Sequence, residues 1–246
     1  MDTANSRRQF LVTSAIASSG LVLAACGNKA APDKTEQTKD KDEQGAEVTA
    51  TEDLMREHGV LRRALLVYAE TVPKLRSDPS SIAPDALQKT AKLFRAFGED
   101  YHEKKLEEAY IFPAITKAGG AAASLPNILI AQHNRGREIT DYILAVTQGA
   151  KLGAANAEAL AKALEGFVLM YQNHAAREDT IIFPAWKNTM SEEQLDQMGD
   201  KFEEIEQQQF GKDGYEDAVK QIGDIEGALG FADLSQFTAP APPKIS

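Results

Sequence analysis

The residues of this chain best suited to chemistry are its four histidines, because imidazole nitrogens bind transition metals such as iron, zinc and copper. Each histidine falls on the apolar stripe of a different predicted helix, and two of these helices carry a glutamate four or five residues further on. Four imidazoles and two carboxylates that converge from four helices predict a two-metal site in a bundle core. The candidate metal ligands are His58, His102, Glu107, His133, His174 and Glu178.

A core role without metal is the alternative for each histidine. A single histidine on an apolar helix face is more commonly a hydrogen-bonded core residue than a ligand. Four of them together with two glutamates favour a metal, because burying so many polar atoms without a cation would leave many of them unsatisfied.

The elements that must position these residues are helices. Apolar residues recur at three- and four-residue steps, and no segment shows the alternation of a strand. The first helix sets in at Thr51, with Thr51 or Asp53 as its cap, and Pro73, Pro79 and Pro84 bracket the loop that follows. Further helices are predicted over about 85–117, 125–147 and 155–188, with accessory helices over 191–209 and 213–229. The stripe of the fourth helix comprises Leu160, Leu164, Phe167, Tyr171, His174, Glu178, Ile181 and Ala185.

An internal repeat relates the two halves of this region. The segment His58 to Arg62 is echoed by His133 to Arg137, and His102…Glu107…Phe112-Pro113 is echoed by His174…Glu178…Phe183-Pro184. The repeat predicts two helical hairpins related by a pseudo-twofold axis, each with two histidines and one glutamate. Arg62 and Arg137 occupy equivalent positions, where they either support the bridging carboxylates or lie in solvent.

The spacing on the second helix requires an irregularity. His174 and Glu178 are four residues apart, about 40° around a helix, whereas His102 and Glu107 are five apart, about 140°. Both glutamates nevertheless lie six residues before the proline of their Phe-Pro pair. We therefore predict Glu107 as the ligand, reached through a π-bulge or a local overtwist, with Glu103 and Glu108 as the fallbacks.

The N-terminus has the features of an export signal. Arg7-Arg8 precedes an apolar stretch, Leu11 to Ala25, which is too short and too polar to span a bilayer. The stretch ends in Leu23-Ala24-Ala25-Cys26, and the whole resembles a bacterial twin-arginine signal with a lipobox. The resemblance implies export to the periplasmic side of the cell envelope and a membrane anchor through lipidated Cys26, which is the only cysteine.

Composition bounds the rest of the chain. A net charge of -10 argues against nucleic-acid binding, since nothing offsets phosphate repulsion. The predicted organisation is an export signal over 1–26, a flexible polar linker over 27–50, a helical bundle over 51–189, accessory helices over 190–232 and a mobile tail over 233–246.

Histidine on each of four helices, with His-x(3-4)-Glu and a trailing Phe-Pro, resembles the hemerythrin-like (HHE) domain over about residues 52–188. The resemblance implies an all-α, antiparallel up-down four-helix bundle and two iron ions bridged by two carboxylates and an oxo or hydroxo group. It implies His58 and His102 on one iron, His133 and His174 on the other, and Glu107 and Glu178 as bridges. Zinc or manganese is the weaker alternative.

One position departs from the oxygen-carrying members, which have a fifth histidine four residues after that of the third helix. Arg137 stands there, and no fifth histidine exists. The set of four histidines and two glutamates resembles members linked to repair of iron centres after nitrosative or oxidative stress. The nearest oxygen donors for the missing ligand are Tyr101, Tyr110 and Tyr171, with core packing as the alternative role for each.

Two classes of function follow. The favoured one is a binding protein for O2, NO or peroxide, or for iron itself, at the cell envelope. The alternative is a di-iron redox enzyme, which is an oxidase, a peroxidase or an iron-centre repair protein. The sequence does not indicate whether a redox partner exists. Ferritin-like oxidases use more carboxylates than the two present here, which favours binding. A zinc protein suits the ligands but not the two-metal symmetry.

Overall fold

The computed structural model describes residues 48–149 and 151–245, so the predicted export signal and nearly all of the predicted linker lie outside the described residues. Residues from Thr49 onward form one compact unit. Every regular element in the described ranges is helical and none is a strand, which confirms the prediction of an all-helical chain.

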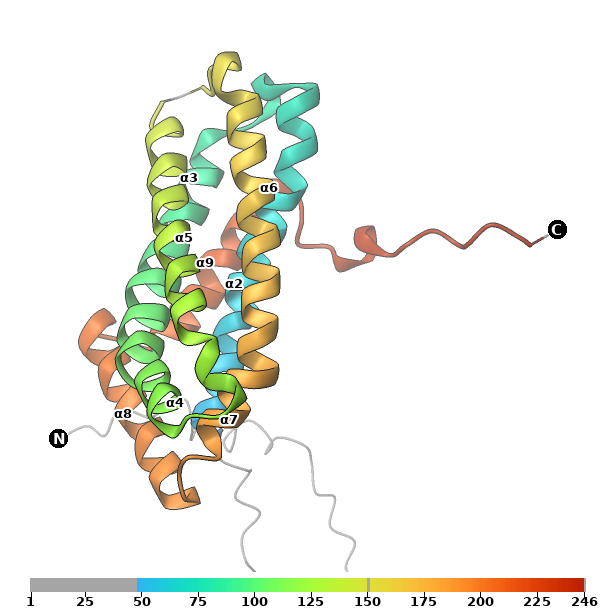
Figure 1. Ribbon diagram of the computed structural model, residues 1–246. Helices are drawn as coiled ribbons and strands as arrows, with labels where there is room; N and C mark the ends of the chain where they lie inside the picture. The colour runs from blue at the N-terminus through green and yellow to red at the C-terminus, as the bar shows by residue number, and fades with distance from the viewer. Residues whose placement is uncertain (1–47, 150, 246) are drawn as a thin grey trace, which may run out of the picture. The chain divides into compact units, whose positions relative to one another are not determined.

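Four long helical segments lie side by side (Figure 1). The first is α2 (Ala50–Ser77). The second segment runs without a break through three consecutive elements. The third segment is the single helix α5 (Pro126–Val146). The fourth segment again runs through three consecutive elements, and α2 packs against the first of them. The second segment consists of α3 (Pro84–Leu93), η2 (Phe94–Ile111, π-helical) and α4 (Phe112–Ala118), and the fourth of α6 (Ala154–Arg177), η4 (Glu178–Ile182, π-helical) and α7 (Phe183–Lys187). The 3-10 turns η1 (Pro79–Ser81) and η3 (Ala121–Ser124) lie in the connections.

The start of α2 corrects one prediction. Thr49 caps the helix, and its hydroxyl accepts a hydrogen bond from the backbone N–H of Glu52 at 3.3 Å. Thr51 and Asp53, the predicted caps, are buried within the first turn instead. The helix therefore begins slightly earlier than its apolar period indicates.

The end of α2 corrects another. Pro73 was predicted to border a loop, but the helix continues through it to Ser77. Leu75 is 1% exposed, and Arg76 binds both carboxylate oxygens of Glu165 on α6 at 2.6 and 2.7 Å. These contacts of the last turn offset the backbone hydrogen bond that proline removes.

A shift in register corrects the stripe of the fourth helix. Ile181 was predicted to face the core, but it is 41% exposed, while Ile182 is fully buried. The π-helical segment η4 inserts an extra residue per turn immediately after Glu178, so every later inward position moves by one.

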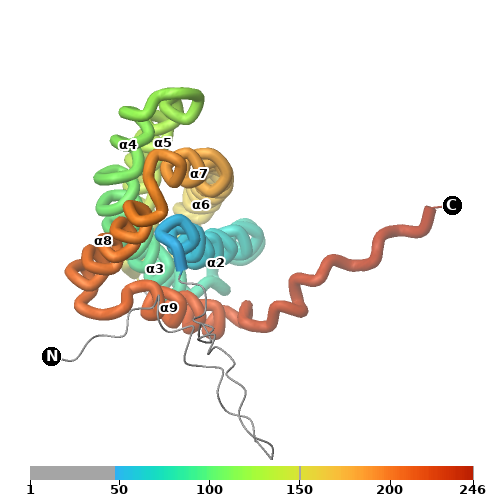
Figure 2. Tube along the Cα trace, turned by 90° about the horizontal axis from the view of Figure 1, so that it is seen from below, coloured from blue at the N-terminus to red at the C-terminus, as the bar shows by residue number. Residues whose placement is uncertain are grey.

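Two accessory helices pack outside the four segments, as predicted (Figure 2). They are α8 (Glu192–Phe210) and α9 (Gly214–Leu229). Ser191 and Gln194 form a capping box at the start of α8. Phe202 of α8 stacks on Trp186 with ring centroids 5.7 Å apart, so the tryptophan packs between α7 and α8. Helix α9 packs against α2 and α3.

The C-terminal segment follows α9 with one short element, the 3-10 turn η5 (Leu234–Phe237). Residues 238–245 contain neither helix nor strand. Within the described ranges, no helix combines the length and the apolar character that crossing a membrane requires.

Candidate metal centre

The four histidines meet as two pairs. His58 of α2 and His102 of η2 approach with their Nε2 atoms 3.0 Å apart, and His133 of α5 and His174 of α6 do the same at 3.0 Å. None of the four is more than 3% exposed. The pairs are those that the family resemblance implies.

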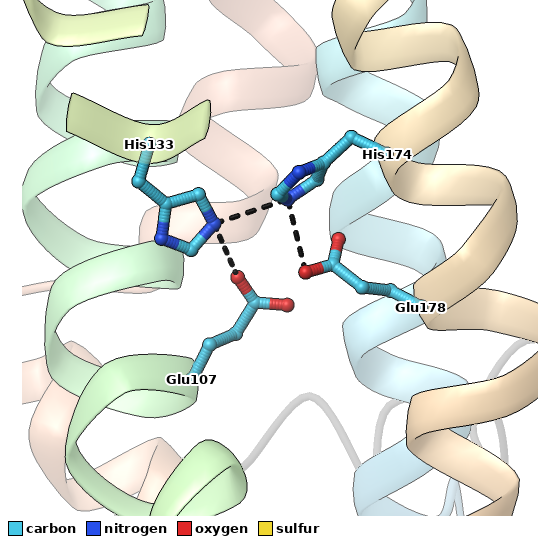
Figure 3. Close-up of side chains that lie close together, drawn as sticks. All are labelled: Glu107, His133, His174 and Glu178. Atoms are coloured by element: carbon cyan, nitrogen blue, oxygen red, sulfur yellow. Dashed lines mark hydrogen bonds and ion pairs between the residues drawn. The ribbon is translucent and has the colours of Figure 1, made fainter. Parts of the chain in front are cut away.

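The two glutamates lie between the pairs. Glu107 places Oε1 3.4 Å from His102 Nε2 and Oε2 3.4 Å from His133 Nε2. Glu178 places Oε1 2.9 Å from His174 Nε2 and Oε2 3.6 Å from His58 Nε2. Each carboxylate thus faces one histidine of each pair, and Figure 3 shows Glu107 and Glu178 reaching His133 and His174 from below. Both glutamates are fully buried.

The π-helical segment η2 brings Glu107 to this position. A π-helix bonds residue i to residue i+5, so side chains five apart lie one above the other. His102 and Glu107 therefore share a face, and the predicted extra residue between them is confirmed. The fallback residues Glu103 and Glu108 lie on the other side of His133, with oxygens 3.9 and 2.8 Å from its Nδ1.

The outward nitrogens of the four imidazoles all face hydrogen-bond acceptors. His58 Nδ1 lies 2.7 Å from Asp179 and His133 Nδ1 lies 2.8 Å from Glu108. The other two contacts are His102 Nδ1 to Glu57 at 2.6 Å and His174 Nδ1 to Gln132 at 2.9 Å. An acceptor at Nδ1 keeps the proton there, so the lone pair of Nε2 points into the centre.

The sequence prediction missed these four acceptors. Each one is the direct sequence neighbour of a predicted ligand: Glu57, Glu108, Gln132 and Asp179. They obey the internal repeat, since Glu57 and Gln132 precede histidines and Glu108 and Asp179 follow glutamates. Pairing the two halves position by position was the signal that would have found them.

The two arginines of the repeat act on these acceptors rather than on the bridging carboxylates. Arg62 donates to Asp179. Arg137 donates to Glu108 at 2.6 Å and to Glu103 at 3.1 Å. The arginines therefore do not support Glu107 and Glu178 directly. Arg62 is exposed, as the solvated alternative predicts, although it is paired with Asp179, whereas Arg137 is half-buried. The guanidinium between Glu103 and Glu108 also makes that acidic pair with His133 an ion-pair network rather than a separate metal site.

The phenylalanines of the repeated Phe-Pro pairs cover the histidines. Phe183 stacks on His58 with ring centroids 5.3 Å apart, and Phe112 stacks on His133 at 5.6 Å. Both phenylalanines are 2% exposed or less. They exclude water from one end of the centre on each half.

The three tyrosines considered for the missing ligand differ in position. Tyr101 donates its hydroxyl proton to Glu57 at 3.0 Å, and Tyr171 donates to Glu103 at 2.7 Å. Tyr110 packs on Phe202 of α8, with ring centroids 5.8 Å apart. Of the three, only Tyr171 lines the cavity beside the histidines.

That cavity lies against the centre and is small. Its volume of about 10 Å³ is enough for about one water-sized molecule. His58, His102 and His174 form one part of its wall. The accessible surface of the cavity is mostly apolar. Its other lining residues are Leu61, Leu65, Phe94, Ala175 and Tyr171, together with the ionisable Arg62, Glu103, Glu107 and Glu178.

The pKa values of the two histidines in each pair are shifted in opposite directions. Burial alone would lower the pKa of His133, but Glu103, Glu107 and Glu108 outweigh it and raise the pKa to about 10. Burial lowers the pKa of its partner His174 to about 4, and the charge on His133 adds to this effect. In the other pair, the pKa of His102 is likewise raised by carboxylates, and the pKa of His58 is lowered by burial. In each pair the pKa of one imidazole is thus raised and the pKa of the other lowered.

The pKa values of Glu107 and Glu178 also differ from each other. Burial alone would raise the pKa of Glu107, but the charges of His102 and His133 hold it well below its ordinary value. Burial and the charge of Glu107 raise the pKa of Glu178 well above its ordinary value. The pKa values of the two carboxylates are thus shifted in opposite directions.

The centre fits a pair of metal ions. All four oxygens of Glu107 and Glu178 are buried without a hydrogen-bond partner among the described residues, a costly arrangement unless cations bind them. Metal–imidazole bonds of about 2.1 Å at right angles would place two Nε2 atoms about 3 Å apart. Both histidine pairs show that separation.

Known proteins provide an independent comparison. The model of the hemerythrin HHE cation-binding domain matches residues 49–186. An uncharacterized protein of Mycobacterium bovis is 42% identical over 239 residues, 94% of this chain and 90% of the relative. Uncharacterized proteins from two Mycobacterium tuberculosis strains match to the same extent. No solved structure gives a significant match. The family model spans more than half of the chain, which therefore belongs to the hemerythrin HHE cation-binding domain family.

Proposed function

We propose that the protein is a non-haem di-iron protein, with a hemerythrin-like four-helix bundle, that binds O2, NO or peroxide at its centre. The observation that carries the proposal is the pair of buried carboxylates, each facing one histidine of each pair with oxygens that have no other hydrogen-bond partner among the described residues. His58 and His102 would hold one iron, and His133 and His174 the other. Glu107 and Glu178 would join the two.

Iron at this centre would supply open coordination positions and one-electron redox chemistry. The protein's own residues fix what surrounds it. Asp179, Glu57, Glu108 and Gln132 keep protons on the four Nδ1 atoms, so the inward nitrogens stay available as donors. Phe112 and Phe183 keep water away from the outer faces of His133 and His58.

The cavity favours a small ligand. It has room for about one water-sized molecule, and Leu61, Leu65 and Phe94 give it apolar walls. Such a space suits a diatomic molecule or peroxide and excludes an organic substrate. Four nitrogens with two carboxylates make a less carboxylate-rich centre than that of the ferritin-like oxidases, which favours binding over oxygen activation.

The test is anaerobic loading of the purified protein with Fe²⁺, followed by metal analysis and absorption spectroscopy. We expect two irons per chain and, after exposure to air, the near-ultraviolet charge-transfer bands of a diferric centre. A carrier should regain its reduced spectrum when O2 is removed. A redox enzyme should stay oxidised until a reductant is added, and it should then turn over peroxide. One zinc or no metal per chain would contradict the proposal.

We also propose that the chain is exported by the twin-arginine route and anchored through lipidated Cys26, on the periplasmic side of the cell envelope. Arg7-Arg8, the apolar stretch and the Leu-Ala-Ala-Cys sequence support this. In a bacterial host, the double variant Arg7→Lys/Arg8→Lys should stay in the cytoplasm, and Cys26→Ser should be exported but released from the membrane fraction. If both variants are found in the same cell fractions as the wild-type protein, the proposal of export and lipid anchoring is contradicted.

A further inference from the structure

The internal repeat of the centre is broken at one acceptor. Glu57 and Gln132 occupy equivalent positions, each immediately before a histidine ligand candidate. Glu57 accepts from His102 Nδ1 at 2.6 Å, and Gln132 accepts from His174 Nδ1 at 2.9 Å. One imidazole is thus hydrogen-bonded to a carboxylate and its counterpart to a neutral amide.

The surroundings reinforce this difference. Glu57 is 1% exposed, and the hydroxyl of the buried Tyr101 also donates to it at 3.0 Å. The repeat places Asn173 where Tyr101 stands in the other half. Asn173 is exposed, and its amide donates to the backbone carbonyl of Leu169 on its own helix. The half-buried Gln132 therefore receives no corresponding hydrogen bond from that position.

The other two acceptors are alike in charge and support. Asp179 and Glu108 are both carboxylates, and each is bound by the arginine of its half, Arg62 or Arg137. Glu103 adds a carboxylate 3.9 Å from His133 Nδ1, but Arg137 and Tyr171 bind it. The difference between the halves is therefore concentrated at His102 and His174.

We infer that Glu57 is a positioning residue that makes the His58–His102 half of the centre bind its metal more tightly than the His133–His174 half. This inference rests on the proposed function, in which each histidine pair holds one metal. A carboxylate at Nδ1 strengthens the hydrogen bond and increases the electron density on Nε2, which makes the imidazole a better donor. An amide at the same place increases the electron density on Nε2 less than a carboxylate does. The chain then loads its two metals in order, and the second is the labile one.

The test is an anaerobic titration of the full chain with Co²⁺, whose visible absorption reports each binding step. The wild-type protein should bind two ions in two resolved steps. Glu57→Gln should weaken the tighter step by about 10- to 100-fold and leave the weaker step near its wild-type value. Gln132→Glu is the matched variant, and it should strengthen the weaker step and narrow the gap. Anomalous scattering from crystals grown with one equivalent of Co²⁺ locates the first ion.

The outcomes are separable. A first ion between His133 and His174, or two steps that neither variant moves, would overturn the inference while leaving the two-metal proposal standing. Failure of the wild-type protein to bind two ions would overturn both. Should Glu57→Gln fail to fold, Gln132→Glu alone decides the matter, because a gain in affinity does not arise from damage to the fold.

Discussion

At the scale of single residues, the centre depends on charge held out of water. Two glutamates and four histidines share a core in which none is more than 3% exposed, and the protons on them must be arranged so that like charges do not meet. The opposite pKa shifts within each histidine pair accomplish this: carboxylates raise the pKa of His133 to about 10, and burial lowers the pKa of His174 to about 4. A metal ion that enters must displace these protons, because only the lone pair of Nε2 is a ligand.

This displacement predicts how metal affinity changes with pH. The pKa of His133 is raised to about 10, so the protein without metal holds this proton at neutral pH, and carboxylates raise the pKa of His102 in the same direction. The loaded centre would hold no proton on the nitrogens that bind the metals. Raising the pH from 6 to 9 should therefore increase the apparent affinity about tenfold per unit for each displaced proton. Competition with a chelator of known affinity measures it, and an affinity independent of pH would show that no proton leaves.

A second residue-scale prediction concerns Gly136. A Cβ at this position would overlap the hydroxyl of Tyr171, which donates to Glu103. Gly136→Ala should destabilise the protein by about 1–3 kcal/mol through overpacking. Gly166→Ala is the matched control, because its Cβ meets nothing within 4 Å, and it should stabilise the helix by up to about 1 kcal/mol. Equal free energies of unfolding for the two variants in urea would refute the packing argument.

The sequence predicted the six candidate ligands but not what surrounds them. Histidine on an apolar stripe and the shared distance to Phe-Pro were enough to choose Glu107 over Glu103 and Glu108, and the structure places Glu107 between the histidine pairs. The roles of Arg62 and Arg137 were not predictable, because they depend on how neighbouring helices are rotated against each other. Their carboxylate partners Asp179 and Glu108 come from other segments of the bundle.

At the scale of elements, two π-helical segments set the register of the centre. In η2 the extra residue lies between His102 and Glu107, whereas in η4 it follows Glu178. Both segments end one residue before a phenylalanine that covers a histidine, Phe112 after η2 and Phe183 after η4. The ligand spacing predicted the first irregularity, because His102 and Glu107 are five residues apart whereas His174 and Glu178 are four apart. The apolar period was the only guide to the second. It did not reveal the second, so Ile181 was placed inward in error.

Helix ends were predicted less well than helix interiors. Thr49 caps α2 in place of Thr51 or Asp53, although these two residues carry the usual signal of a helix start. At the other end, tertiary packing of Leu75 and Arg76 extends the helix beyond Pro73. Such packing involves residues far apart in the chain and is not visible in a local pattern. The accessory helices, in contrast, carry local signals in the capping box at Ser191 and the glycines Gly211 and Gly230 in the left-handed conformation.

Helix α8 reaches the centre through one side chain. Phe210 packs on Tyr101 with ring centroids 5.3 Å apart, and Tyr101 holds Glu57 against His102. Phe210→Ala should lower the free energy of unfolding by about 1–3 kcal/mol and also weaken the tighter metal site. Phe237→Ala, in the 46% exposed ring of η5, is the control and should leave both unchanged. A loss of stability without a change in metal affinity would break the proposed link between α8 and the centre.

At the scale of the whole molecule, the metals would complete the core. The protein without metal carries buried carboxylate oxygens that lack hydrogen bonds within the described residues, whereas the loaded protein satisfies them. Binding to the folded state alone stabilises it by about 4 kcal/mol when free metal is a thousandfold above Kd. Chelation should therefore lower Tm by about 10 °C. The double variant His58→Ala/His133→Ala should show the same Tm with and without chelator. If the chelator does not change the Tm of the wild-type protein, the metals do not stabilise the fold.

The most direct test of the central claim is a crystal structure of the iron-loaded protein, with the anomalous signal measured on both sides of the iron absorption edge. We expect two iron peaks, one contacting His58 and His102 and the other contacting His133 and His174, with Glu107 and Glu178 each touching both. A single peak, or a peak among Glu103, Glu108 and Nδ1 of His133, would contradict the claim.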